Sequence, residues 1–184
     1  MKNMIVYGVF LGFLLIGCQT HISNSKKPEV KEQEKPETPD LINTAPHFTY
    51  TTDPNEIRQA CESVISMINR ALPELKKVEK KVMFEGVPNT PITIWYSDTD
   101  LPVKIECAVT DDSGGFKGDF IQYYFINGQL WYSDHYFARY LFDSDKLQFW
   151  MDENWRINEI PAKDFKDREM ILKSDVENFL SKNK

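Results

Sequence analysis

The residues that could perform acid–base or nucleophilic chemistry do not form a recognisable catalytic arrangement. Residues 112–115 place a serine in a glycine loop, but the sequence holds no Gly-x-Ser-x-Gly, P-loop or His-Glu-x-x-His motif. Glu106 and Asp119 are the candidates for the paired carboxylates that a hydrolase would bring together in a cleft. The sequence therefore predicts no catalytic residue, no cofactor and no metal ion, and a hydrolase with paired carboxylates is the alternative.

Aromatic residues are concentrated in one part of the chain and supply the best candidate for a binding surface. Of the 21 aromatic residues after Gly17, 14 lie between Phe116 and Trp155. Runs such as 123–126 are apolar on both faces of a strand, so helices on one face alone do not explain them. Either both faces are covered, or some rings form an exposed platform for a sugar or a protein partner. The candidates for that platform are Tyr124, Trp131, Tyr132, Tyr136, Trp150 and Trp155.

The first 17 residues have the pattern of a secretion signal. After a short positive start, the apolar run 4–16 would span roughly 20 Å as a helix, less than the ~30 Å core of a bilayer. The run ends in Leu15-Ile16-Gly17-Cys18, which resembles the lipobox of bacterial lipoproteins. That resemblance implies cleavage before Cys18, lipidation of Cys18 and a membrane anchor. An ordinary signal peptide or an uncleaved anchor is the alternative.

The residues after Cys18 bear on where such a lipoprotein would be sorted. In enterobacterial lipoproteins an aspartate at this position tends to mark retention in the inner membrane, and this chain has Gln19. The acidic cluster that marks surface export in some Gram-negative groups is also missing from residues 19–22. The resemblance therefore implies an outer-membrane protein that faces the periplasm.

Two further cysteines lie in patterns that direct them to a core. Cys61 belongs to an apolar helical stripe, and Cys107 alternates with Ile105 and Val109 on a predicted strand. Disulfides persist in exported proteins, so Cys61 and Cys107 could be bridged. Two buried free thiols are the alternative. A zinc site lacks further ligands because no Cys-x-x-Cys or paired histidines are present.

The chain divides into three segments of unlike composition. After the signal (1–17), residues 18–45 hold the lipidated cysteine and a tether without aromatic residues, rich in Pro, Glu and Lys, which predicts disorder. Residues 46–184 suit a single domain. The whole chain of 184 residues has a net charge of −6, which argues against nucleic-acid binding.

The folded segment is predicted to be an α+β domain. Asp53-Pro54 begins a helix whose apolar positions recur every three or four residues, and Pro73 should split it from a second helical segment that carries Val78 and Val82. Residues 92–160 follow strand patterns separated by turns, with Asn127-Gly128 as the clearest hairpin turn. A C-terminal helix closes the chain. We expect an N-terminal helix, an antiparallel meander of five or six strands and a C-terminal helix.

A second resemblance concerns the hairpin at residues 139–150. Arg139-Tyr140-Leu141-Phe142, followed by Lys146-Leu147 and Trp150, is similar to hairpins in small envelope lipoproteins of Bacteroidetes-type bacteria. It implies a secreted α+β fold and carries no known activity. Taken together, the sequence predicts a lipid-anchored envelope protein that binds an envelope protein or a glycan through an aromatic sheet.

Overall fold

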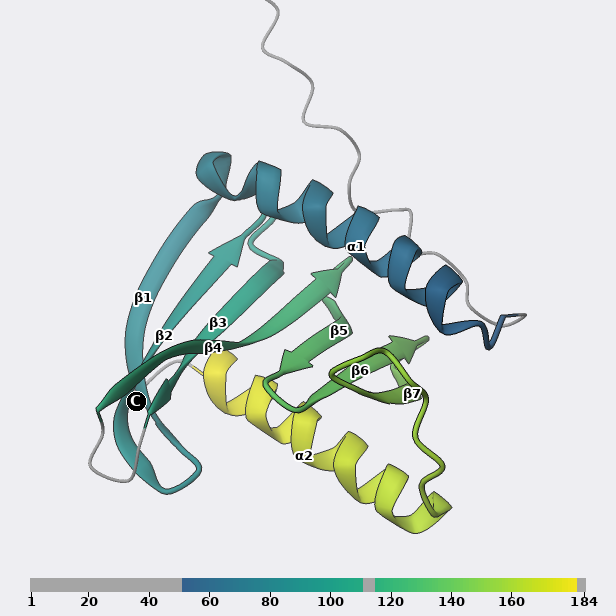
Figure 1. Ribbon diagram of the computed structural model, residues 1–184. Coiled ribbons are helices and arrows are strands. Elements are labelled where there is room, and N and C mark those ends of the chain that lie inside the picture. The colour runs from purple at the N-terminus through teal and green to yellow at the C-terminus, as the bar shows by residue number, and fades with distance from the viewer. Residues whose placement is uncertain (1–50, 111–114, 182–184) are drawn as a thin grey trace, which may run out of the picture. The chain divides into compact units, whose positions relative to one another are not determined.

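A computed structural model describes residues 51–110 and 115–181 (Figure 1). The signal sequence, Cys18, the tether and most of the loop at 112–115 therefore lie outside the described residues. The described elements, in chain order, are α1 (Pro54–Ala71), a 3-10 turn (Leu72–Glu74), β1 (Lys76–Phe84), β2 (Val87–Tyr96), β3 (Pro102–Thr110), β4 (Phe116–Ile126), β5 (Gln129–His135), β6 (Ala138–Asp143), β7 (Lys146–Asp152) and α2 (Ala162–Leu180).

The residues at the two ends of α1 determine where this helix begins and ends, as the sequence predicts. The Asp53 carboxylate accepts a hydrogen bond of 2.8 Å from the backbone amide of Asn55, and Pro54 occupies the first turn. The helix ends at Ala71, where the 3-10 turn that contains Pro73 begins. Its buried residues, Ile57, Cys61, Val64 and Ile68, form the predicted apolar stripe.

The segment after Pro73 is a strand, and the prediction of a second helical segment there was wrong. β1 pairs with β2 from the Lys76–Tyr96 pair to the Phe84–Val87 pair. The turn between them is made by Glu85 and Gly86, whose φ angles of 48° and 81° are those of a tight hairpin. Val78 and Val82 fit a period of two as well as a period of four, so their spacing alone could not decide between strand and helix.

The seven strands form one antiparallel sheet in sequential order, β1 to β7, so each strand pairs with its neighbours along the chain. The α+β fold is confirmed, and the expected five or six strands are corrected to seven. Asn127 and Gly128 make the predicted turn between β4 and β5, with φ angles of 52° and 73°. Ser144 and Asp145 make the equivalent turn between β6 and β7.

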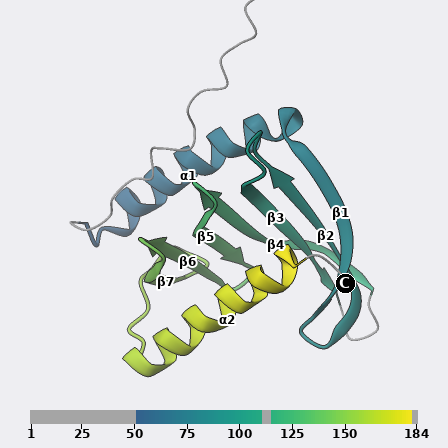
Figure 2. The same ribbon diagram turned by 180° about the vertical axis from the view of Figure 1, so that it is seen from behind.

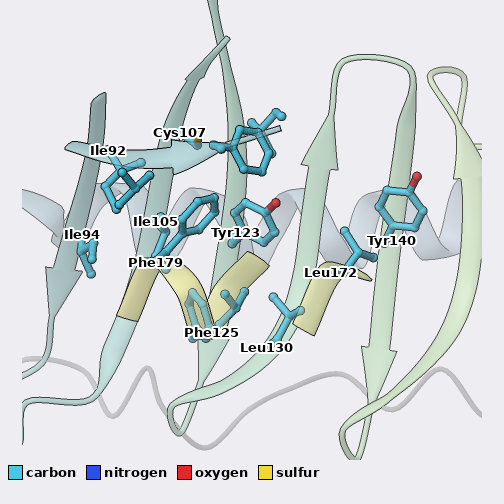
Figure 3. Close-up of a cluster of buried hydrophobic side chains, with 14 of the residues drawn as sticks. Ile92, Ile94, Ile105, Cys107, Tyr123, Phe125, Leu130, Tyr140, Leu172 and Phe179 are labelled. Carbon is cyan, nitrogen blue, oxygen red and sulfur yellow. The ribbon is translucent and has the colours of Figure 1, made fainter. Parts of the chain in front are cut away.

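The two helices pack on opposite faces of the sheet (Figures 1 and 2). Alternation along β4 shows the division: Tyr123 faces α2, whereas Tyr124 faces α1. On the α2 side, Phe179 lies among apolar side chains of the central strands (Figure 3). On the α1 side, the apolar stripe of the helix packs on the aromatic residues of β4 and β5. Residues 123–126 of β4 are therefore apolar on both faces, because each face is covered there by its own helix.

Candidate functional site

Four of the six residues predicted to form an exposed aromatic platform are buried. Tyr124, Trp131, Tyr132 and Trp155 are 2%, 4%, 0% and 8% exposed. The Tyr132 ring stacks on Trp155, with a centroid distance of 5.9 Å and an interplanar angle of 10°. The platform hypothesis is wrong for these four residues because they pack with the buried residues of α1 in one cluster.

The other two predicted residues lie on different parts of the surface. Trp150 is half-buried on the α2 side, where the Arg168 guanidinium lies 5.1 Å from its ring centroid. Tyr136 is 62% exposed and contacts Phe137, which is 77% exposed, edge to face at 4.6 Å. Both occupy the turn between β5 and β6, where His135 pairs with Ala138. Phe137 was not predicted from the sequence, although it directly follows Tyr136 in a short turn.

Cys61 and Cys107 do not form the disulfide considered from the sequence. Both thiols are free and fully buried. Cys61 lies in the cluster on the α1 side of the sheet, whereas Cys107 lies in the cluster on the α2 side. The sheet therefore separates them. Burial raises the pKa of each thiol to about 12, with smaller contributions from nearby acidic groups, so both are protonated and unreactive at neutral pH.

A row of polar side chains crosses the α1 side of the sheet beside the part that α1 covers. The strand register pairs Thr93 with Glu106, Glu106 with Gln122, Gln122 with Asp134, and Asp134 with Arg139. Directly paired residues point to the same face of a sheet, so these five side chains form one continuous line, the polar row. All five residues are only partly buried. The adjacent line, which includes Tyr124, Tyr132 and Leu141, is buried under α1.

Intramolecular contacts hold the polar row in place. The Arg139 guanidinium lies 3.5 Å from an Asp134 carboxylate oxygen and also donates to the Asp152 carbonyl at 3.1 Å. The Tyr132 hydroxyl donates to Asp134 at 3.3 Å, and the Tyr124 hydroxyl donates to Gln122. Burial raises the pKa of Asp134 above its ordinary value, although Arg139 and the Tyr132 hydrogen bond oppose this. These contacts orient the donors and acceptors of Gln122, Asp134 and Arg139.

Lys104 joins one end of α1 to the sheet next to this row. Its ammonium group, 4% exposed, donates to Asn69 of α1 at 2.9 Å and pairs with Glu106 at 2.7 Å. It also lies over the rings of Tyr124 and Trp95, 4.9 Å and 5.7 Å from their centroids. A buried ammonium with this many partners is stable only in one arrangement, so it fixes α1 relative to the sheet.

Exposed aromatic side chains lie beside the polar row, on the side of the row that faces away from α1. Gln122 of β4 pairs with Asp134 of β5. Phe120 lies two residues before Gln122, and Tyr136 lies two residues after Asp134, toward the same end of the sheet. Phe120 is 45% exposed. We call Phe120, Tyr136 and Phe137 the aromatic edge. Polar row and aromatic edge together form the candidate site.

Comparison with known proteins finds no matching family model, no matching curated protein and no matching solved structure. Within residues 51–110 and 115–181, no helix is long and apolar enough to cross a membrane. In the same residues, no group of three or more His, Cys, Asp or Glu side chains is placed to hold a metal ion.

The two carboxylates proposed for the hydrolase alternative, Glu106 and Asp119, have different surroundings on the sheet. Glu106 belongs to the polar row on the α1 side and is engaged by Lys104. Asp119 lies one residue before Phe120, and Phe120 pairs with Ala108, two residues from Glu106 on β3. Asp119 is exposed and lies where the pairing of β4 with β3 shifts register, between the Ala108–Phe120 and Thr110–Phe116 pairs.

The polar row could be found in the sequence only in part. Gln122 and Asp134 are polar residues in two strands that are otherwise largely aromatic and aliphatic. Because side chains alternate between the two faces of a strand, each residue indicates a polar position on one face. Their joining into a line with Glu106 and Arg139 depends on the register of three strand pairs. That register is decided by the hairpin turns and by packing against both helices.

Proposed function

We propose that this protein is a lipid-anchored protein of the bacterial cell envelope whose folded domain binds an envelope protein or a glycan. The lipobox-like Leu15-Ile16-Gly17-Cys18 supports the anchor, and the Pro/Glu/Lys-rich residues 19–45 support a spacer between anchor and domain. An outer-membrane location that faces the periplasm follows from Gln19, as in the lipoproteins that the sequence resembles.

The observation that carries the binding role is the juxtaposition of the polar row with the aromatic edge. Oriented carboxylate, amide and guanidinium groups provide directional hydrogen bonds, and adjacent exposed rings provide apolar area. Such a mixture of rigid aromatic and polar groups is typical of recognition surfaces. We therefore expect the partner to contact the sheet face on which α1 packs, in the part of that face that the helix leaves uncovered.

Binding is tested on the full-length protein in its own membrane by crosslinking and recovery of partners. We expect the Tyr136→Ser/Phe137→Ser variant to lose the partners that the wild-type protein recovers, while the fold is retained because both side chains are exposed. The matched control is Met170→Ser/Ile171→Ser, which removes two side chains of α2 that are 56% and 50% exposed. Equal recovery by the wild-type protein and the aromatic-edge variant would overturn the proposed surface.

The anchor is tested separately by metabolic labelling with a fatty-acid analogue. We expect Cys18→Ala to abolish labelling, whereas Cys61→Ala retains it because the Cys61 thiol is buried and protonated. Labelling that persists in Cys18→Ala would show that the lipobox assignment is wrong, without bearing on the binding surface.

A further inference from the structure

The charged side chains of the polar row are neutralised by the protein's own charges. The Glu106 carboxylate lies 2.7 Å from the Lys104 ammonium, and the Asp134 carboxylate lies 3.5 Å from the Arg139 guanidinium. Each pair sums to zero, so the row offers no net charge that would attract a charged partner. A ligand bound here is therefore selected by its hydrogen-bonding groups and its shape rather than by its charge.

Ion pairs of this kind are costly to bury beneath another protein. A pair that loses its contacts with water keeps only its internal attraction, which often does not repay the lost hydration. The cores of protein–protein interfaces are accordingly poor in charged residues. A ligand rich in hydroxyl groups avoids this cost, because each hydroxyl can donate to a carboxylate or accept from a guanidinium in place of a water molecule. The composition of the row thus favours a sugar over a protein surface.

The polar row contains both donors and acceptors of hydrogen bonds. Glu106 and Asp134 carry acceptor oxygens, and the Gln122 amide lies between them in the strand register. The Tyr124 hydroxyl donates to the Gln122 amide oxygen, so the amide nitrogen is the group that can donate to a ligand. Sugar hydroxyls both donate and accept, and they can therefore pair with each of these groups in turn.

Exposed apolar side chains follow the polar row on the side away from α1. Pro91 of β2 lies two residues before Thr93, a member of the row, and is exposed. Phe120, 45% exposed, and Tyr136, 62% exposed, continue this line on β4 and after β5. A sugar ring has a polar rim and apolar C–H faces, and aromatic rings supply an apolar surface on which such faces can pack. The two lines together therefore match both parts of a sugar ring.

The polar row extends across most of the sheet. Neighbouring strands are ~4.8 Å apart, so the row from Thr93 on β2 to Arg139 on β6 spans roughly 19 Å. On β1 the line continues as Glu79, which pairs in register with Thr93 and is neutralised by Lys77 at 2.5 Å. A single sugar would contact only part of this length, whereas a linear chain of sugars can follow the row from strand to strand.

We propose that the polar row and the aromatic edge bind a neutral oligosaccharide chain that lies across strands β2 to β6. The hydroxyl groups of the chain hydrogen-bond to the row, and the apolar faces of its sugars pack on Phe120 and Tyr136. This inference rests on the proposed binding function and names the ligand of the same surface.

The test is a glycan array probed with the full-length protein in detergent. The array carries neutral oligosaccharides of hexoses and N-acetylhexosamines in several lengths, beside uronic-acid and sulfated oligosaccharides. We expect binding to neutral chains that strengthens with chain length, with an affinity that changes by less than about twofold between about 0.1 M and 1 M NaCl. An array on which no neutral chain binds, or on which only charged chains bind, overturns the proposal.

Variants of the row locate the binding on the sheet. Gln122→Ala should weaken binding to the neutral chain by about three- to tenfold, because it removes a hydrogen-bonding group from the middle of the row. Thr93→Val removes only a hydroxyl from a partly buried side chain and should weaken binding in the same direction without unfolding the protein. Gln148→Ala is the matched control, on an exposed position of β7 outside the row. Unchanged affinity in both row variants overturns the proposal.

The crosslinking experiment with Tyr136→Ser/Phe137→Ser tests the binding surface without assuming a glycan. If that variant loses a protein partner while the array shows no neutral chain bound, the surface is retained and the oligosaccharide proposal is wrong. If the variant loses no partner and the array shows no binding, both proposals are wrong.

Discussion

The two faces of the sheet are covered to different extents, and this difference separates the stabilising part of the molecule from its candidate site. On the α2 side, apolar residues from β1 to β7 pack with Leu172, Val176 and Phe179 in one cluster. On the α1 side, the helix covers one line of aromatic residues, and the adjacent polar row is only partly buried. A face that is covered along its whole width stabilises the fold, whereas a half-covered face can also present side chains to a partner.

The largest expected effect comes from removing an aromatic side chain on the fully covered side. Phe179→Ala should lower the free energy of unfolding by about 3–5 kcal/mol, because Phe179 is 0% exposed and packs on Phe84 and Tyr123. Met170→Ala, on the exposed side of the same helix, should change it by no more than about 0.5 kcal/mol. Urea denaturation measures both. Similar losses in the two variants would contradict the assignment of α2's packing face.

On the half-covered side, the strongest single contribution is expected from the buried lysine. Lys104→Met should lower the free energy of unfolding by about 1–3 kcal/mol, because Asn69 and Glu106 lose their shared partner. Arg58→Met breaks an exposed ion pair with Glu62 and should cost only about 0.3–0.5 kcal/mol. If the two variants lose equal stability in urea denaturation, Lys104 does not fix α1 to the sheet.

A smaller, pH-dependent effect is expected at Asp175, on the α2 side. Burial and the nearby Glu85 raise the pKa of Asp175 to about 6, against the opposing effects of Arg168 and Tyr123. The folded protein thus holds this proton more tightly than the unfolded chain does. The resulting stability is fully present below the ordinary pKa of about 4 and is lost as the pH rises through about 6.

Asp175→Asn should therefore stabilise the protein at pH 7 by about 1 kcal/mol, a value reduced for solvent screening because the residue is only half-buried. At pH 3 the variant and the wild-type protein should unfold at nearly the same urea concentration. Glu177→Gln, on an exposed position of the same helix, is the control. A stabilisation of Asp175→Asn that is equal at both pH values would rule out titration of Asp175 as the cause.

The smallest effect on stability is expected at the aromatic edge. Tyr136→Ser/Phe137→Ser should change the free energy of unfolding by no more than about 0.5 kcal/mol per residue, because both side chains are mostly exposed. Urea denaturation beside the crosslinking experiment checks that lost binding is not lost folding. A large loss of stability would place these residues in the core and remove the distinction between the two faces.

The amino-acid sequence predicted the elements whose signals are local. The Asp53-Pro54 cap, the apolar stripe of α1 and the Asn127-Gly128 turn depend on residues close in the chain, and all three are confirmed. The strand β1 was predicted as helix, because valines four residues apart fit both periods and lysines are common at helix ends. Only pairing with β2 decided this segment.

The sequence by itself determined that the domain is α+β and that its aromatic residues concentrate in one stretch of the sheet. Cys18 and the tether remain predictions, since they lie outside the described residues. The tertiary structure decided which rings are buried, that Cys61 and Cys107 lie on opposite faces, and that Glu106, Gln122 and Asp134 share one line. The physical reason is that alternation tells which residues share a strand face, whereas burial and cross-strand proximity depend on which helix covers that face and on the register of neighbouring strands.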